Sequence, residues 1–300
     1  DSNSSGGTGD LQVEDSENSG NTGDQQVGGS SGSGTADDTA GAEGGADTTG
    51  AEGGNDSTSV TPSNRVEVNG TVYATLDEAI AAAEPVNGVI TYEIYGKVEA
   101  NSTESWIEVL KAGLTDVTKV AFVGMTNDAE ISITNSTSVL ADQNYDIDVS
   151  FVDLTLSHSN GAWVGDLGHA TEYFTCVLRN TDAANNTVTY TNCTFPNGAC
   201  NNQYGKTVFD TCEFTNTTSG KYNLWNYGGT TEITKSAFTG TRGIKTYNEG
   251  TLAESPEVAI KDTTFTGLTE KAAIVASKPT DIKLDSISAV SYTHLRAHET

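Results

Sequence analysis

The stretch 187–214 decides how this chain folds, and it reads TVTYTNCTFPNGACNNQYGKTVFDTCEF. It contains one unit of a repeat, Val188–Phe195, and then the next, Thr207–Phe214. In both units small or apolar side chains stand seven, five and two positions before a closing Phe. A step of two keeps side chains on one face of a strand, whereas the step of three changes that parity. We therefore expect a corner inside each unit, where polar residues such as Asn192 adopt turn backbone.

The same template occurs seven times, with closing residues 22, 17, 19, 24, 27 and 24 positions apart. The closing column is Leu156, Leu178, Phe195, Phe214, Phe238, Phe265 and Ala289. Five positions earlier stand Phe151, Tyr173, Tyr190, Phe209, Ile233, Ile260 and Leu284. A drifting period with constant short strands is typical of a solenoid whose insertions fall in loops. Coils that stack ~4.8 Å apart would bury these columns as one continuous core.

The repeat resembles the right-handed parallel β-helices of the pectin-lyase-like superfamily, over roughly residues 66–289. The resemblance implies an all-β fold of three sheets. Third strands are expected at 162–164, 201–204, 224–227, 244–247 and 273–275. Because the family includes lyases, hydrolases, adhesins and inert stalks, the resemblance leaves the function open.

The region before the regular array shows helix signals. Thr75 and Glu78 have the spacing of a capping box, and the Ala-rich run that follows stops at Pro85. Residues 68–80 resemble the leading segment of bacterial surface β-helices, in which a helix covers the open end of the solenoid. We expect an N-terminal capping helix at 76–84, then a short helix or a loop insertion at 104–113. Residues 120–122 and 131–133 are interpreted as irregular early coils.

The composition divides the chain into three parts. Residues 1–64 hold twelve acidic residues and no Lys or Arg, are rich in Gly, Ser and Thr, and are predicted to form a disordered linker. Residues 65–289 form the predicted β-helix domain. Residues 290–300 break the pattern and resemble a translated sequencing adapter from a metagenomic assembly, so we expect the natural protein to continue with further coils.

The net charge and the hydropathy of the chain exclude some classes of partner. The chain has a net charge of −26, of which −14 falls after residue 64. Nucleic acid is therefore not expected as a partner, because it requires a basic surface. No run approaches the ~20 apolar residues of a membrane span. We expect an extracellular or bacterial cell-surface location, through a lipoprotein or wall tether, and a host or microbial glycan or a surface protein as the partner.

Aromatic residues on the third strands are the candidate ligand-binding site. If Leu224 stacks on Ile244 inside the solenoid, Trp225 stacks on Lys245 and Tyr227 on Tyr247 outside it. Sugar rings stack on aromatic faces, so we interpret this strip as a carbohydrate-binding surface. Its predicted members are Trp163, Tyr204, Trp225, Tyr227, Lys245 and Tyr247. The alternative is that the rings cover the sheet or point into the core.

Two other groups of residues have side chains of the types that bind metal ions or form disulfides. Asp146, Asp148 and Asp153 suggest a Ca²⁺ site, although acidic residues on a solvated outer face are common. Otherwise we expect no cofactor. The sequence puts Cys176, Cys193 and Cys212 in one inward column. A ladder of buried thiols is favoured, because no Cys-x-x-Cys pair suggests zinc, while a disulfide between coils stays open.

Fragments of the polygalacturonase signature also occur, at 168–169, 180–182 and 242–245. Their order differs from that family, and no Asp pair lies between them to serve acid–base hydrolysis. We therefore expect a non-catalytic β-helix that works in adhesion, glycan binding or as a stalk. The alternative is a polysaccharide lyase or glycoside hydrolase that acts at the third-strand face.

Overall fold

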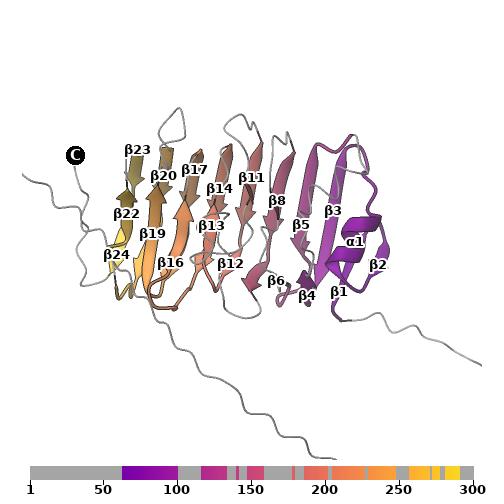
Figure 1. Ribbon diagram of the computed structural model, residues 1–300, viewed down its shortest axis with the longest axis horizontal. Coiled ribbons are helices and arrows are strands. Elements are labelled where there is room, and N and C mark those ends of the chain that lie inside the picture. Colours follow the sequence, from indigo (N-terminus) through magenta and orange to yellow (C-terminus); the bar gives the residue numbers. More distant parts are fainter. Residues whose placement is uncertain are drawn as a thin grey trace, which may run out of the picture. The chain divides into compact units, whose positions relative to one another are not determined.

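The computed structural model describes residues 63–100, 116–133, 140–141, 147–158, 178–179, 186–201, 205–226, 229–247, 257–270, 272–277 and 281–290. The chain divides into two units between Ser57 and Thr58, and every described residue belongs to the second. In its described residues that unit is an all-β, solenoid-like stack of parallel sheets with the helix α1 at Leu76–Ala82 (Figure 1). A chain with two-residue periodicity and short strands builds a core only by stacking successive coils.

Three sheets run along the stack. The first sheet contains β1 (Arg65–Val68), β2 (Thr71–Tyr73), β3 (Val89–Tyr95), β5 (Lys119–Gly124), β8 (Asp148–Val152), β11 (Thr187–Thr191), β14 (Lys206–Asp210), β17 (Thr230–Thr234), β20 (Glu257–Lys261) and β23 (Asp281–Asp285). The second contains β4 (Lys97–Ala100), β6 (Glu130–Ile133), β9 (Thr155–His158), β12 (Thr194–Phe195), β15 (Glu213–Phe214), β18 (Ala237–Thr239), β21 (Thr264–Thr266) and β24 (Ser288–Val290). The third contains β13 (Ala199–Asn201), β16 (Tyr222–Asn226), β19 (Arg242–Tyr247) and β22 (Ile274–Ser277). A separate parallel pair joins β7 (Leu140–Ala141) and β10 (Leu178–Arg179).

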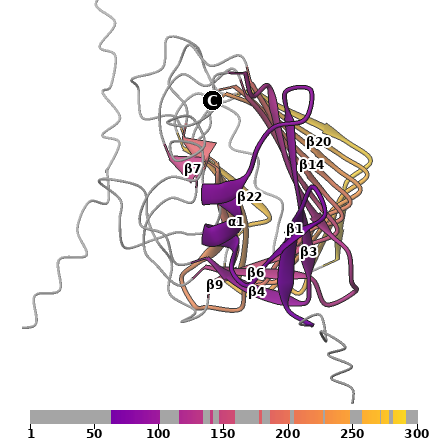
Figure 2. The ribbon, with the colours of Figure 1, turned by 90° about the vertical axis from the view of Figure 1, so that its right-hand side faces the viewer.

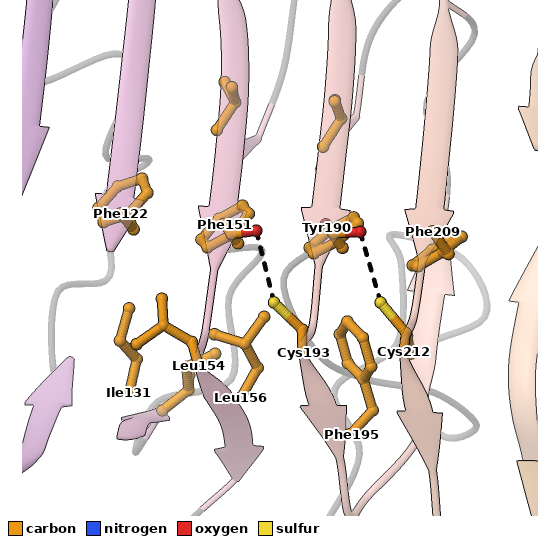
Figure 3. Packing of buried hydrophobic residues seen from close by; sticks show 14 of the residues in the cluster. Phe122, Ile131, Phe151, Leu154, Leu156, Tyr190, Cys193, Phe195, Phe209 and Cys212 are labelled. Carbon is orange, nitrogen blue, oxygen red and sulfur yellow. Dashed lines mark hydrogen bonds between the residues drawn. The ribbon is translucent and has the colours of Figure 1, made fainter. Parts of the chain in front are cut away.

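The inward columns predicted from the repeat are present. Tyr92, Phe122, Phe151, Tyr190 and Phe209 stack in order, with adjacent ring centres 4.8 to 5.0 Å apart. Figure 3 shows the last four of these rings on neighbouring strands. A second column stacks Phe195, Phe214, Phe238 and Phe265. Rings of the two columns meet edge to face, so the core is a continuous aromatic packing along the stack.

The corner between the first and second sheets is the bend that the parity change predicts. One residue in each of six corners has a positive φ, between 48° and 58°: Asp153, Asn192, Thr211, Lys235, Asp262 and Ser286. Left-handed backbone costs roughly 1–2 kcal/mol for a residue with a side chain. Hydrogen bonds to the next coil offset this cost. The backbone amide of Asn192 donates to the Asp210 carbonyl, and the backbone amide of Thr211 donates to the Thr234 carbonyl.

One predicted coil is wrong. The spacing put Tyr173, Cys176 and Leu178 in the columns between Phe151 and Tyr190, but Phe151 pairs directly with Tyr190. Leu178 lies in β10 instead and pairs with Leu140, outside the three main sheets. Tyr173 and Cys176 lie outside the described residues. Cys193 therefore follows Leu154 in its column, as the Thr194 amide donates to the Leu154 carbonyl.

The two segments that the sequence marked as irregular form one coil of the regular stack. Phe122 pairs with Phe151 and Ile131 with Leu156, so β5 and β6 continue the same columns. Nine positions separate Phe122 from Ile131, where five separate Phe151 from Leu156. The extra residues form a longer corner loop, which hid the register from a fixed-spacing search.

Helix α1 closes the N-terminal end of the described stack. The Glu78 amide donates to the Thr75 hydroxyl at 3.2 Å, as the capping box predicts. Leu76, Ala79 and Ile80 are buried and join the core of the coils. Figure 2 looks onto this end and shows α1 beside β1. The predicted capping helix is confirmed, although it ends at Ala82 because Ala83 is already extended.

Candidate functional site

The third sheet has the register that the sequence predicted. Leu224 pairs with Ile244, and Trp225 pairs with Lys245. Leu224 and Ile244 belong to the buried core, whereas Trp225 does not. Alternation along a strand therefore places Trp225 and Lys245 on the outer face of this sheet. This outer face of β16 and β19 gathers cationic and aromatic side chains.

Four side chains form what we call the cation–aromatic cluster: Tyr222, Trp225, Arg242 and Lys245. The Lys245 ammonium lies 4.1 Å from the centre of the Trp225 ring. The Arg242 guanidinium carbon lies 5.3 Å from the centre of the Tyr222 ring. The two rings meet edge to face, with centres 6.0 Å apart. Cations over aromatic faces are attracted by the ring quadrupole, so the cluster holds itself together.

The rings of this cluster are enclosed. Trp225 is 5% exposed and Tyr222 is 6% exposed, although both lie outside the apolar core. Lys245 occupies the Trp225 face at cation–π distance. The described part of the predicted strip is therefore a packed cluster, and a sugar ring would stack on Trp225 only after Lys245 moved aside.

Glu270 connects two loops at the edge of the cluster. Its carboxylate accepts hydrogen bonds from the Ser219 hydroxyl at 2.7 Å, the Gly220 amide at 2.9 Å and the Arg242 Nε at 2.9 Å. The Ser219 hydrogen bond, followed by the Gly220 amide and Arg242, lowers the pKa of Glu270 from its ordinary value. The ionised carboxylate thus fixes Arg242 beside Tyr222.

The structure brings together part of the aromatic strip that the sequence predicted on the third strands. Trp225 and Lys245 come together as expected. Trp163, Tyr204 and Tyr227 lie outside the described residues, and of Tyr247 only the backbone in β19 is described. Tyr222 and Arg242 were missed, because strict alternation puts Tyr222 on the face of Leu224. Asn223, between Tyr222 and Leu224, has a buried side chain that accepts from the Asn216 backbone amide and donates to the Thr239 and Arg242 carbonyls. In the sequence, the polar Asn223 beside the apolar Leu224 is the one signal that this strand departs from strict alternation.

The two described Asp residues of the predicted Ca²⁺ site lie at opposite ends of β8. Asp148 begins β8, and its carboxylate accepts from the Thr187 amide at 2.7 Å. Asp153 lies in the corner beyond the other end of β8 and accepts from the Asn192 side chain. Asp146 lies outside the described residues. Within the described ranges, no group of three His, Cys, Asp or Glu side chains is placed to hold a metal ion.

The two described members of the cysteine column are buried free thiols. Cys193 donates to the Phe151 carbonyl at 3.5 Å, and Cys212 donates to the Tyr190 carbonyl at 3.4 Å (Figure 3). Each thiol therefore contacts the preceding coil in the same way. Cys193 and Cys212 are thus buried on adjacent coils, as the ladder predicts. The coil that would place Cys176 in the same column is absent, because Phe151 pairs directly with Tyr190, and Cys176 itself lies outside the described residues.

Comparisons with family models, with curated proteins and with solved structures find no match to this chain. No helix in the described part of the chain is long and apolar enough to span a bilayer. The class that the fold itself defines is an all-β, solenoid-like protein of stacked parallel strands.

Proposed function

We propose that this protein is a right-handed parallel β-helix of the pectin-lyase-like type. It acts without catalysis at a bacterial cell surface, as a stiff stalk that presents carbohydrate-binding surfaces for adhesion. The order of strands supports the fold. From β11 to β24 the chain visits the first, second and third sheets in turn, and each strand pairs in parallel with its counterpart in the next coil.

The observation that carries the stalk role is the unbroken packing along the stack. In the first sheet eight parallel strands, β3 to β23, keep one register without a slip. Their rise is about 4.8 Å per strand, so this run extends over roughly 30 Å. Stacked rings fill the interior over most of that length. Bending such a stack would separate rings and ladder hydrogen bonds in several coils at once, which makes it stiff.

Ion pairs on the outer face of the first sheet also join successive coils. Lys206 pairs with Glu232 at 2.8 Å, and Lys283 pairs with Glu257. Lys261 and Asp285 are 3.7 Å apart. Exposed pairs contribute little individually, at about 0–1 kcal/mol, but like charges in these positions would oppose stacking. The pattern supports a surface that stays in water while its coils remain aligned.

The composition of residues 1–64 supports the proposed location. This part is acidic, lacks Lys and Arg, and is rich in Gly, Ser and Thr. Such chains act as flexible, self-repelling tethers. A tether before a stiff solenoid suits a protein that reaches away from a lipid or wall anchor.

The described part of the third-strand face supports binding more than hydrolysis or elimination. It gathers two rings, two cations and the Glu270 carboxylate. Glycoside hydrolysis uses a pair of carboxylates, one of which must exchange a proton with the substrate. Glu270 is instead held ionised by Arg242, Ser219 and Gly220, which suits it to a structural role.

Two measurements on the full chain test this function. Force spectroscopy between the chain ends should show one mechanically resistant unit, and Phe209→Ala should lower its unfolding force. Incubation with polygalacturonate and with neutral polysaccharides should yield neither unsaturated product in the ultraviolet nor new reducing ends. Product formation that is lost in Arg242→Gln would overturn the non-catalytic role and favour a lyase.

A further inference from the structure

A polar groove crosses four successive coils at the corner between the first and second sheets. We call it the corner groove, and its volume is about 490 Å³. Its lining includes the corner residues Asp153, Asn192 and Thr211 and the strand residues Thr155, Thr194 and Glu213, which we call the floor. The loop 125–127 also lines it, and we call this loop the wall. Since each floor pair comes from the next coil, the groove follows the axis of the stack.

The wall exists because one corner is longer than the others. The chain turns from β8 to β9 through Asp153 and Leu154 alone, but between β5 and β6 it loops through 125–129. Gly124 brings this loop against the next corner, where an added Cβ would lie 1.9 Å from the Asp153 carbonyl oxygen. Only glycine fits this contact, so the sequence specifies the close approach of loop and floor.

Hydrogen bonds to the preceding coil fix the loop. The Met125 amide donates to the Ile94 carbonyl at 2.8 Å. The Gly96 amide donates to the Thr126 hydroxyl at 2.9 Å. The Ala129 amide donates to the Thr126 carbonyl at 3.0 Å and closes the loop. The wall is therefore preformed, and a ligand would not have to order it on binding.

The chemistry of the lining selects among ligands. Hydroxyl groups of Thr126, Thr155, Thr194 and Thr211 and the Asn192 amide repeat along the groove. The side-chain amide of Asn192 donates to the Asp153 carboxylate at 2.6 Å, which aligns two neighbouring floor residues. The lining contains the carboxylates of Asp153 and Glu213 and neither Lys nor Arg. Repeated neutral hydrogen-bonding groups favour a polyhydroxylated ligand, while the carboxylates repel an anionic one.

The shape and the apolar edge point to a chain of sugars. The floor groups recur at the coil rise of about 4.8 Å, which is comparable to the length of one sugar ring in an extended oligosaccharide. Met125, on the wall, is 46% exposed and offers an apolar surface above the polar floor. Sugars present hydroxyl edges and apolar faces together, as this groove does.

We propose that the corner groove binds an extended, uncharged oligosaccharide whose chain runs parallel to the axis of the stack. The proposal rests on the proposed carbohydrate-binding function and names the ligand class and a surface other than the cation–aromatic cluster. One sugar unit would lie over each coil, with hydroxyl groups bonded to the Thr and Asn side chains of the floor.

Affinity electrophoresis of the full chain in gels containing β-glucan, xylan or galactomannan tests the proposal, with polygalacturonate as the anionic comparison. Thr194→Trp fills the floor of the groove. The matched control is Thr264→Trp, because Thr194, Glu213, Ala237 and Thr264 pair in sequence along the same column, and Thr264 does not line the groove. We expect retardation by at least one neutral polysaccharide, a roughly tenfold or greater loss in Thr194→Trp, and none in Thr264→Trp.

The outcomes separate the groove from the function as a whole. If the unaltered chain binds neutral polysaccharide and Thr194→Trp binds equally well, the groove is wrong while carbohydrate binding stands. Loss of binding in Lys245→Met instead would assign it to the cation–aromatic cluster. Retardation by none of the polysaccharides would overturn both proposals. Retardation by oligolysine that Glu213→Gln removes, without neutral glycan binding, would show that the groove takes a cationic peptide. Circular dichroism and the urea midpoint confirm that each variant is folded.

Discussion

The Lys245 ammonium lies 4.1 Å above the ring of Trp225, and the two residues are paired in register on adjacent coils. The contact therefore joins two coils through side chains as well as through the sheet. A cation over a partly desolvated indole contributes about 0.5–2 kcal/mol. The cluster is a clamp on the outer face of the third sheet.

Replacing Lys245 tests this clamp. Lys245→Met keeps the aliphatic stem and removes the charge, so we expect the free energy of unfolding in urea to fall by roughly 1 kcal/mol. Lys245→Arg should retain most of it. Lys235→Met is the control, because Lys235 is an exposed lysine 4.0 Å from Asp210. Equal losses in Lys245→Met and Lys235→Met would show that the contact with Trp225 adds nothing.

The free energy of unfolding lost on truncating a core side chain should depend on the position of that side chain along the stack. Phe209 is buried between Tyr190 and the next coil, so Phe209→Ala should cost about 3–5 kcal/mol of unfolding free energy. Leu284 stands in the same column at the last described coil but is 48% exposed. Leu284→Ala should cost roughly 0.5 kcal/mol. Chemical denaturation of both variants compares them, and a similar cost at the two sites would refute the column as the main source of stability.

Tyr92 offers a stabilising substitution. Its ring begins the stacked column, and its hydroxyl is buried without a hydrogen-bond partner in the described part of the chain. Burial raises the pKa of Tyr92 far above its ordinary value, with a smaller contribution from Tyr73. Tyr92→Phe should raise the free energy of unfolding by about 1 kcal/mol, because it removes an unsatisfied polar atom and keeps the ring. Tyr95→Phe is the control, since the Tyr95 hydroxyl donates to Glu93 at 3.4 Å. A loss of stability in Tyr92→Phe would contradict this account.

The Glu270 contacts should open in acid. Because its pKa is lowered in the folded protein, the stabilisation is complete above the unfolded value near 4.5 and disappears as pH falls through the lower folded value. The amide of Gly220 donates to this carboxylate, so its nuclear magnetic resonance shift should move in that acidic window. Glu270→Gln should abolish the pH-dependent movement. A Gly220 signal that titrates identically in the variant would assign the effect to another group.

The columns could be predicted from the sequence because their spacing is local. Steps of two, three and two are visible within eight residues of Val188–Phe195, and the corner follows from the parity change. The same test wrongly accepted Tyr173 to Leu178, because spacing alone does not reveal which strands pair. It also passed over Phe122 and Ile131, since a longer corner changed their separation without changing their register.

The candidate site divides in the same way. Trp225 and Lys245 were predictable, because the inward residues Leu224 and Ile244 fix the register of their neighbours. Arg242 and Glu270 were not, since their contact joins positions 28 residues apart and depends on the path of a loop. The corner groove was missed as well. It arises from an insertion in a corner loop, and a search for repeated spacing ignores such insertions. Its floor residues Asn192 and Thr211 are recognisable in the sequence only as turn formers.

The long corner between β5 and β6 leaves the register of the columns unaltered, so the interior and the surface of this architecture can change separately. Substitutions in the columns change the stability of the stack, whereas insertions at a corner change the shape of its surface. A scaffold of this kind can accommodate a new surface loop in one coil while the packed interior of the neighbouring coils stays unchanged.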